Sequence, residues 1–299
     1  MKKPETSIEQ IRNWWNRNPY TYGTSTQGLY RDVGPLVLDG VGANEVFAKY
    51  EKKYSKHLRE SLDGAGRLAG RFIPYDDIVG KRVLDVACGY GWASIAMAQN
   101  GCDVFAIDLT PAAVTFTSQY ASFKGLKVAT GEMSAEEISF PDSYFDFVLG
   151  WGFVMHTEKP EVALKEMIRV LKPGGQLVVY FYYRHSISFW WNIFFLRGIL
   201  LGYLFKYRGD VERLTSRFTD GQSFGGNAKT LCLSRKWFRH ALSGEDNISL
   251  YFQGWGPPSL LDSFPVSKFP MGKLFPRRLK NIWSKRFGFG HILTVTKLV

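Results

Sequence analysis

The stretch Lys81-Arg-Val-Leu-Asp-Val-Ala-Cys-Gly-Tyr-Gly-Trp-Ala-Ser94 decides the fold of this chain. Its apolar start, residues 83–87, is long enough for a strand that is buried on both faces. Gly89 and Gly91 then supply a turn in which a Cβ would be strained. Residues 92–100 continue as a helix that ends before Gly101. A strand, a glycine turn and a helix N-terminus predict a nucleotide-sized site, because the first N–H groups of a helix lack partners.

Two acidic residues accompany this turn. Asp85 lies within the first strand, and Asp108 ends the next predicted strand, residues 103–108. An acid at the tip of the second strand is placed to accept hydrogen bonds from ribose hydroxyls. The dinucleotide fingerprint G-x-G-x-x-G needs a third glycine, and Ser94 stands there instead, so the sequence does not favour a dinucleotide-binding protein.

Two motifs carry a resemblance to a known family. Residues 85–91 resemble the first motif of class I S-adenosylmethionine (SAM) methyltransferases, and residues 131–146 resemble the adenine-binding loop of the type 11 family. The resemblance covers residues 81–183 and implies that the cofactor is SAM. Ser134 stands where the family commonly has an acid that bonds the adenine, which leaves the Ala135 N–H to contact the ring. The cofactor-binding residues implied in this way are Asp85, Gly89, Gly91, Asp108, Leu109, Ser134, Ala135 and Trp151.

Strands and helices alternate beyond the glycine turn, which predicts a parallel, doubly wound sheet. The expected elements are helices at residues 111–123 and 160–171 and strands at residues 126–130, 145–151 and 176–183. The resemblance adds a last, antiparallel strand at residues 291–297, preceded by a strand at residues 247–253. The predicted fold class is α/β: a Rossmann-like class I methyltransferase fold with a mostly parallel sheet and an aromatic-rich helical insertion after the fifth strand.

Four regions are expected along the chain. They are an N-terminal flap and helix (1–62), the SAM-binding core (63–183), a helical insertion that forms an acceptor lid (184–240), and C-terminal core strands with a basic amphipathic helix (241–299). The flap is inferred from the aromatic residues 11–22, which are equally compatible with a hydrophobic plug at the edge of the domain.

The formal charge of +11 lies in the C-terminal part of the chain. Residues 1–183 hold 20 Lys and Arg against 21 Asp and Glu, whereas residues 184–299 hold 18 against 6. Residues 186–205 are nearly apolar around their circumference, with Arg197 near the middle. We interpret them as a helix pair that lines a pocket for a hydrophobic acceptor, with additional contact to lipid as an alternative. The basic helix expected from Pro276 fits an anionic membrane, an acidic acceptor or the protein core.

Methyl transfer to a hydroxyl or a protonated amine requires removal of a proton, whereas a thiolate acceptor needs no strong base. His156 follows the fourth predicted strand and His185 the fifth, so both are candidate general bases. Tyr180, Tyr182, Tyr183 and Asp220 are weaker candidates. The three cysteines show no ligand spacing, and no metal is expected.

The favoured function is therefore a SAM-dependent methyltransferase acting on a bulky or hydrophobic small molecule at O, N or S. An RNA methyltransferase is one alternative, because the tail is basic, and a non-catalytic SAM-binding protein is another. The apolar insertion is a poor RNA surface and no RNA module is appended, so no nucleic-acid partner is expected. Residues 1–6 lack the apolar segment of a signal peptide, which predicts a cytoplasmic protein, with membrane association as an alternative.

Overall fold

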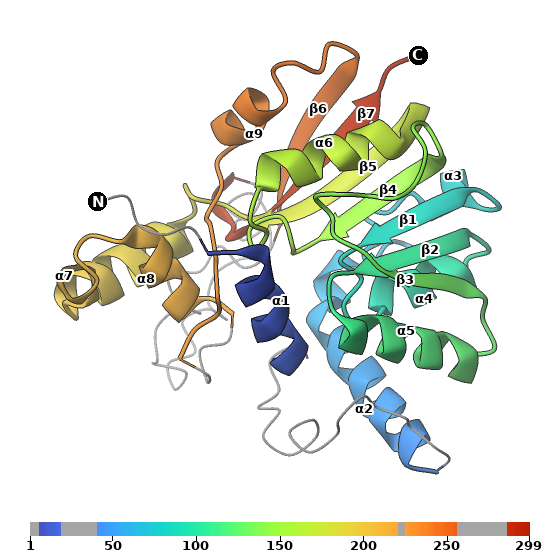
Figure 1. The fold of residues 1–299 in the computed structure, drawn as a ribbon, viewed down its shortest axis with the longest axis horizontal. Coiled ribbons are helices and arrows are strands. Elements are labelled where there is room, and N and C mark those ends of the chain that lie inside the picture. Colours follow the sequence, from blue (N-terminus) through green and yellow to red (C-terminus); the bar gives the residue numbers. More distant parts are fainter. Residues whose placement is uncertain (1–5, 19–40, 221–224, 256–285) are drawn as a thin grey trace.

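The computed structural model describes residues 6–18, 41–220, 225–255 and 286–299 (Figure 1). Their strands form one sheet in the order β3-β2-β1-β4-β5-β7-β6. Strands β1 to β5 run parallel, and β7 runs antiparallel to both of its neighbours, which confirms the predicted fold class. The strands are β1 (Arg82–Val86), β2 (Asp103–Asp108), β3 (Val128–Glu132), β4 (Phe145–Trp151), β5 (Leu171–Tyr182), β6 (Ile248–Trp255) and β7 (Gly290–Lys297).

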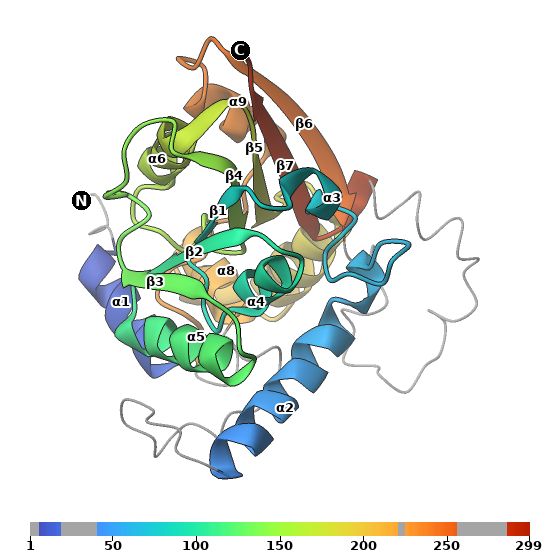
Figure 2. The same cartoon turned by 90° about the vertical axis from the view of Figure 1, so that its right-hand side faces the viewer.

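Helices cover both faces of the sheet (Figures 1 and 2). On one face, α2, α4 and α5 bury a cluster that includes Phe47, Trp92 and Phe116. On the other face, α6 and α9 bury a cluster that includes Leu164 and Phe238. The helices are α1 (Ile8–Arg17), α2 (Val41–His57), η2 (Arg59–Ser61), α3 (Tyr75–Ile78), α4 (Trp92–Gln99), α5 (Pro111–Phe123), α6 (Pro160–Val170), η3 (Ser188–Leu200), α7 (Tyr203–Lys206), α8 (Val211–Phe218) and α9 (Arg235–Ala241).

Several predicted strand boundaries were wrong by one to five residues, and glycines explain the errors at β3 and β5. The third strand was expected at residues 126–130, but β3 continues to Glu132 because Gly131 pairs with Ile107 in the ladder. The turn expected at residues 172–175 lies inside β5 instead. Leu171 already pairs with Phe145 before the register shifts and Gln176 pairs with Phe147, so the turn is a bulge within one strand.

The glycine turn between β1 and α4 has the backbone that the sequence predicts. Gly89 has φ +56° and Gly91 has φ +76°, both in the left-handed region. The two positions differ in the space around them. A Cβ on Gly91 would lie 2.7 Å from the Thr117 side chain, whereas a Cβ on Gly89 would meet nothing within 4 Å. Gly91 is therefore required for packing, and Gly89 borders open space.

This difference predicts different costs for two matched substitutions. Gly89→Ala and Gly91→Ala both place a side chain at positive φ, which costs about 1–2 kcal/mol of unfolding free energy. Gly91→Ala also overpacks against Thr117 and is expected to lose a further ~1–3 kcal/mol. Urea unfolding of both variants measures the difference. Equal losses would contradict the packing role assigned to Gly91.

The insertion after β5 contains η3, α7 and α8, which agrees with the expected helical character of residues 186–205. Helix η3 is a π-helix of 13 residues, a wider turn than the sequence pattern indicated. Arg197 lies with its guanidinium over the Phe218 ring, 5.1 Å from the ring centroid. None of the helices in the described ranges combines the length and apolar character needed to cross a membrane. The basic helix predicted from Pro276 falls almost entirely outside the described residues.

Candidate active site

A pocket lies at the carboxyl ends of the parallel strands, where the strand order reverses between β1 and β4. Its wall includes Ala87 after β1, Leu109 after β2, Gly152 after β4 and Tyr182 at the end of β5. The space inside it, counted with its open mouth, is about 1420 Å³. The wall combines buried polar groups with aromatic rings, as small-molecule sites commonly do.

Two buried carboxylates form part of this wall. Asp108 accepts hydrogen bonds from the Gly89 N–H at 3.0 Å and from the N–H and hydroxyl of Thr110, both at 2.8 Å. Asp85 accepts a hydrogen bond from the Ser94 hydroxyl at 2.5 Å. Burial raises the pKa of Asp85 to about 7, and it also raises the pKa of Asp108. A cationic ligand would offset the cost of ionising these buried groups.

The other residues predicted to bind the cofactor are distributed around the same pocket. Ser134, Ala135 and Trp151 line it together with Asp85, Gly89, Asp108 and Leu109, and the Trp151 ring stacks on Tyr180 with centroids 5.1 Å apart. Gly91 is not among the lining residues that the structure describes, and its role is in the turn.

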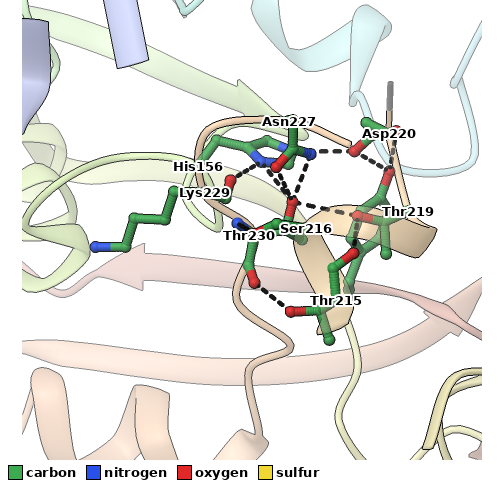
Figure 3. Close-up of polar contacts among 9 residues, drawn as sticks. His156, Thr215, Ser216, Thr219, Asp220, Asn227, Lys229 and Thr230 are labelled. Atoms are coloured by element: carbon green, nitrogen blue, oxygen red, sulfur yellow. Dashed lines mark hydrogen bonds and ion pairs between the residues drawn. The ribbon is translucent and has the colours of Figure 1, made fainter. Parts of the chain in front are cut away.

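His156 lies in the pocket wall within a network of buried polar groups (Figure 3). Its Nδ1 is 2.7 Å from the Lys229 carbonyl oxygen, and its Nε2 is 3.1 Å from Oδ2 of Asp220. The Tyr182 hydroxyl donates to the Asp220 carboxylate, with both oxygens at 2.9 Å. We call His156, Asp220 and Tyr182 the polar triad. All three of its members line the pocket.

The contacts of His156 determine how many protons the polar triad holds. A carbonyl oxygen only accepts, so Nδ1 must donate to Lys229. The contact between Nε2 and Oδ2 is favourable only if one proton lies between them, on either atom. The pair of His156 and Asp220 therefore shares one proton across this contact.

Further hydrogen bonds hold the polar triad in place. Thr230 reaches His156 Nδ1 at 3.3 Å through its hydroxyl, exchanges hydrogen bonds with the Asn227 amide, and accepts from Thr215 of α8 through its carbonyl at 2.5 Å. Trp15 of α1 packs edge-on against His156, with ring centroids 5.0 Å apart. The described side chains form no group of three or more His, Cys, Asp or Glu that could hold a metal ion.

The structure does not bring His185 to this pocket. His185 is exposed, and its nearest recorded ring neighbour is Tyr183, which forms a bridge with Leu233. The chain therefore leaves the sheet at the end of β5, and only His156 of the two predicted bases faces the cavity.

Sequence reasoning gave α1 only an undecided role and ranked Asp220 low. Helix α1 supplies Ile8, Ile11 and Trp15 to the pocket wall. Its N-terminal amide donates to Glu158 at 2.5 Å, and its Arg12 donates to the Leu109 carbonyl at 3.1 Å and contacts Glu132. The aromatic density of residues 11–15 was the signal for α1, whereas no local signal marks Asp220.

Residues 84–179 match the family model described as a methyltransferase domain, the type 11 model. Residues 84–179 of this chain form a class I, type 11-like methyltransferase domain. Its cofactor is SAM, as the sequence motifs predicted. The residues of this pocket fit that cofactor, because the Asp85 carboxylate suits its cationic amino-acid end, because the Asp108 carboxylate suits its ribose hydroxyls, and because Gly89 leaves open space where a side chain would otherwise stand.

The chain spans between about a third and three fifths of the length of the curated relatives it matches. The chain is 35% identical over 151 residues to a Mycobacterium ulcerans protein named phthiotriol/phenolphthiotriol dimycocerosates methyltransferase 2, covering 47% of this chain and 58% of that protein. It is 34% identical over 103 residues to the ubiquinone biosynthesis O-methyltransferase of Pseudomonas fluorescens, covering 34% of this chain and 44% of that protein. An uncharacterized Mycobacterium bovis protein is 37% identical over 100 residues, and the match covers 33% of this chain and 36% of that protein.

The fold also resembles solved structures. A Pyrococcus horikoshii protein aligns with a TM-score of 0.51 at 16% identity, over 82% of this chain and 92% of that one. The YcgJ protein of Bacillus subtilis aligns with a TM-score of 0.50 at 16% identity, over 75% and 96%. At this level of identity the similarity establishes the fold alone.

Proposed function

We propose that this protein transfers a methyl group from SAM to a hydroxyl group of a hydrophobic small molecule. The observation that carries the proposal is one pocket with two unlike sides. Asp85, Gly89 and Asp108 line one side, and the polar triad lines the other among aromatic rings. SAM, when bound, supplies a methyl group made electrophilic by a sulfonium.

The cofactor side is assigned residue by residue. Asp108 would hold the ribose hydroxyls, and Asp85 would lie toward the amino-acid end of the cofactor. Leu109, Ser134 and Ala135 would surround the adenine. Trp151 is placed between the two sides, where its stacked contact with Tyr180 fixes the orientation of both rings.

The acceptor side favours a molecule that is mostly apolar with one hydroxyl. Trp15, Tyr180 and Trp255 contribute aromatic wall. The Trp255 indole N–H is buried and has no hydrogen-bond partner among the described residues, so it is available to an oxygen of the acceptor. The pair of His156 and Asp220 can take the hydroxyl proton as the oxygen–carbon bond forms, with Tyr182 placed to relay it.

The names of the relatives agree with this class of acceptor. One names a lipid, a phthiotriol dimycocerosate, and another names ubiquinone biosynthesis by O-methylation. A buried proton acceptor is needed for a hydroxyl but not for a thiolate, so the polar triad favours O-methylation over S-methylation.

The test is a titration with SAM followed by a panel of acceptors. We expect a dissociation constant in the micromolar range, about −8 kcal/mol. Release of S-adenosylhomocysteine is expected with alkylated phenols or quinols, and not with small polar catechols or transfer RNA. Turnover of RNA would support the alternative function, and SAM binding without turnover of any acceptor would support a non-catalytic protein.

A further inference from the structure

The outer surface of the insertion is apolar, although its inner surface is packed. On η3, Phe189, Ile193 and Gly198 are buried, and a Cβ on Gly198 would lie 3.1 Å from Leu214 of α8. Trp190, Phe195 and Ile199 are exposed. The buried residues are spaced four or five positions apart, and so are the exposed ones; this spacing is one turn of a π-helix. Helix η3 thus has one face toward α8 and a second apolar face toward solvent.

The apolar face continues onto α7. Leu200, Leu201 and Phe205 are 67%, 61% and 76% exposed. Within the ranges that the structure describes, six of the twelve exposed large apolar residues fall between Trp190 and Phe205. Helix α7 lies at the left-hand extreme of Figure 1, away from the sheet. We call these six residues, with the surface they form, the outer apolar face. Exposed apolar side chains gathered in one short segment indicate an interaction surface.

The charges beside the outer apolar face are mainly basic. Residues 184–213 contain five basic residues, Arg184, Arg197, Lys206, Arg208 and Arg213, against two acidic ones, Asp210 and Glu212. Lys206 and Arg208 are exposed next to Phe205, and Arg213 is exposed on α8. Exposed aromatic and aliphatic side chains bordered by cationic ones suit the interface of a bilayer with anionic head groups.

We propose that the outer apolar face docks this protein reversibly on an anionic lipid bilayer. The insertion that carries this face continues through α8 to Asp220 in the pocket. Docking would therefore bring a hydrophobic acceptor near the polar triad. In this respect the proposal rests on the proposed function. The alternative is that this face binds a second copy of the chain. The test below distinguishes membrane binding from self-association.

The test is co-sedimentation of the full chain with vesicles, without any acceptor. We expect the wild type to pellet with vesicles of phosphatidylglycerol and phosphatidylcholine, to pellet less with phosphatidylcholine alone, and to be released by high salt. The double variant Leu201→Glu and Phe205→Glu is expected to lower the partition coefficient at least about tenfold. The matched control is Val79→Glu with Tyr251→Glu, two residues that are 58% and 63% exposed elsewhere. It makes the same charge change and should pellet like the wild type.

A second measurement avoids charge changes and loss of folding. Quenching of tryptophan fluorescence by brominated lipids is expected in the wild type and reduced in Trp190→Phe. Failure of the wild type to pellet would overturn the proposal, and so would equal losses in both double variants. Light scattering that shows a dimer converted to a monomer by Leu201→Glu and Phe205→Glu, without an effect on vesicles, would assign the face to self-association. Because vesicle binding needs no catalysis, His156→Asn should still pellet, and failure of the acceptor panel would leave this result intact.

Discussion

Replacing His156 with asparagine is expected to lower kcat by about 10²–10⁴ on a hydroxyl acceptor, while the affinity for SAM stays nearly unchanged. The amide of asparagine can still donate to the Lys229 carbonyl, which His156 Nδ1 reaches at 2.7 Å. It has no basic nitrogen that can accept a proton near neutral pH. The variant therefore keeps the anchor of the polar triad and loses its capacity to accept the proton.

Two further variants sharpen this test. Asp220→Asn keeps the shape of the side chain but removes the carboxylate that shares the proton, so both kcat and its pH profile are expected to change. His185→Ala removes the other histidine that the sequence offered, which is exposed to solvent, and should keep the wild-type kcat. A full kcat in His156→Asn, or its loss in His185→Ala, would contradict the assignment. Thermal unfolding checks that each variant is folded.

Replacing Asp85 with asparagine is expected to stabilise the protein at pH 8 while it weakens SAM binding. The folded-state pKa of Asp85 is raised to about 7 from an ordinary 3.8. Between about pH 4 and 7 the folded chain therefore binds more protons at this site than the unfolded chain, and wild-type stability falls as the pH rises through that window. Asparagine carries no charge, so the stability advantage of the variant over the wild type should grow by roughly 2–3 kcal/mol between pH 5 and pH 8.

The loss in affinity measures the role of Asp85 in binding. Removing a carboxylate that faces a cationic group is expected to cost about 1.5–3 kcal/mol at pH 8. Urea unfolding at both pH values and calorimetric titration with SAM give the two quantities. Ser94→Ala is the matched control, because it deletes the hydrogen bond to Asp85 at 2.5 Å and keeps the charge, and it should destabilise the protein at pH 8. A variant with the same stability as the wild type at pH 8 would contradict the burial argument.

The sequence predicted those parts of the fold that local patterns control. Strands β2 and β4 and helix α5 have the predicted bounds, because an apolar run or a proline at the first helical turn defines each of them. Gly131 misled the prediction of β3, since a glycine inside a ladder looks the same in sequence as one that ends a strand.

The candidate site also has a part that local sequence patterns predicted and a part that they did not. The cofactor residues lie within or beside the short motifs around Gly89, Asp108 and Ser134, so a linear pattern predicted them. The partner of His156 comes from 64 positions further along the chain, and only the packing of α8 brings Asp220 within 3.1 Å. His156 and His185 have equivalent positions in the sequence, each after a strand. Only the path of the backbone at Tyr183 separates them.

The attachment of α1 has a consequence for the timing of turnover. The helix is tied to the rim of the pocket at Glu158, Leu109 and Glu132, and through the Ala112 N–H, which donates to Asn16 at 3.4 Å. The side chains of Arg12 and Glu132 are 42% and 45% exposed, and pairs this open contribute only about 0–1 kcal/mol each. We therefore expect the departure of the spent cofactor to need, at most, the loss of these few contacts of α1, and no unfolding of the sheet.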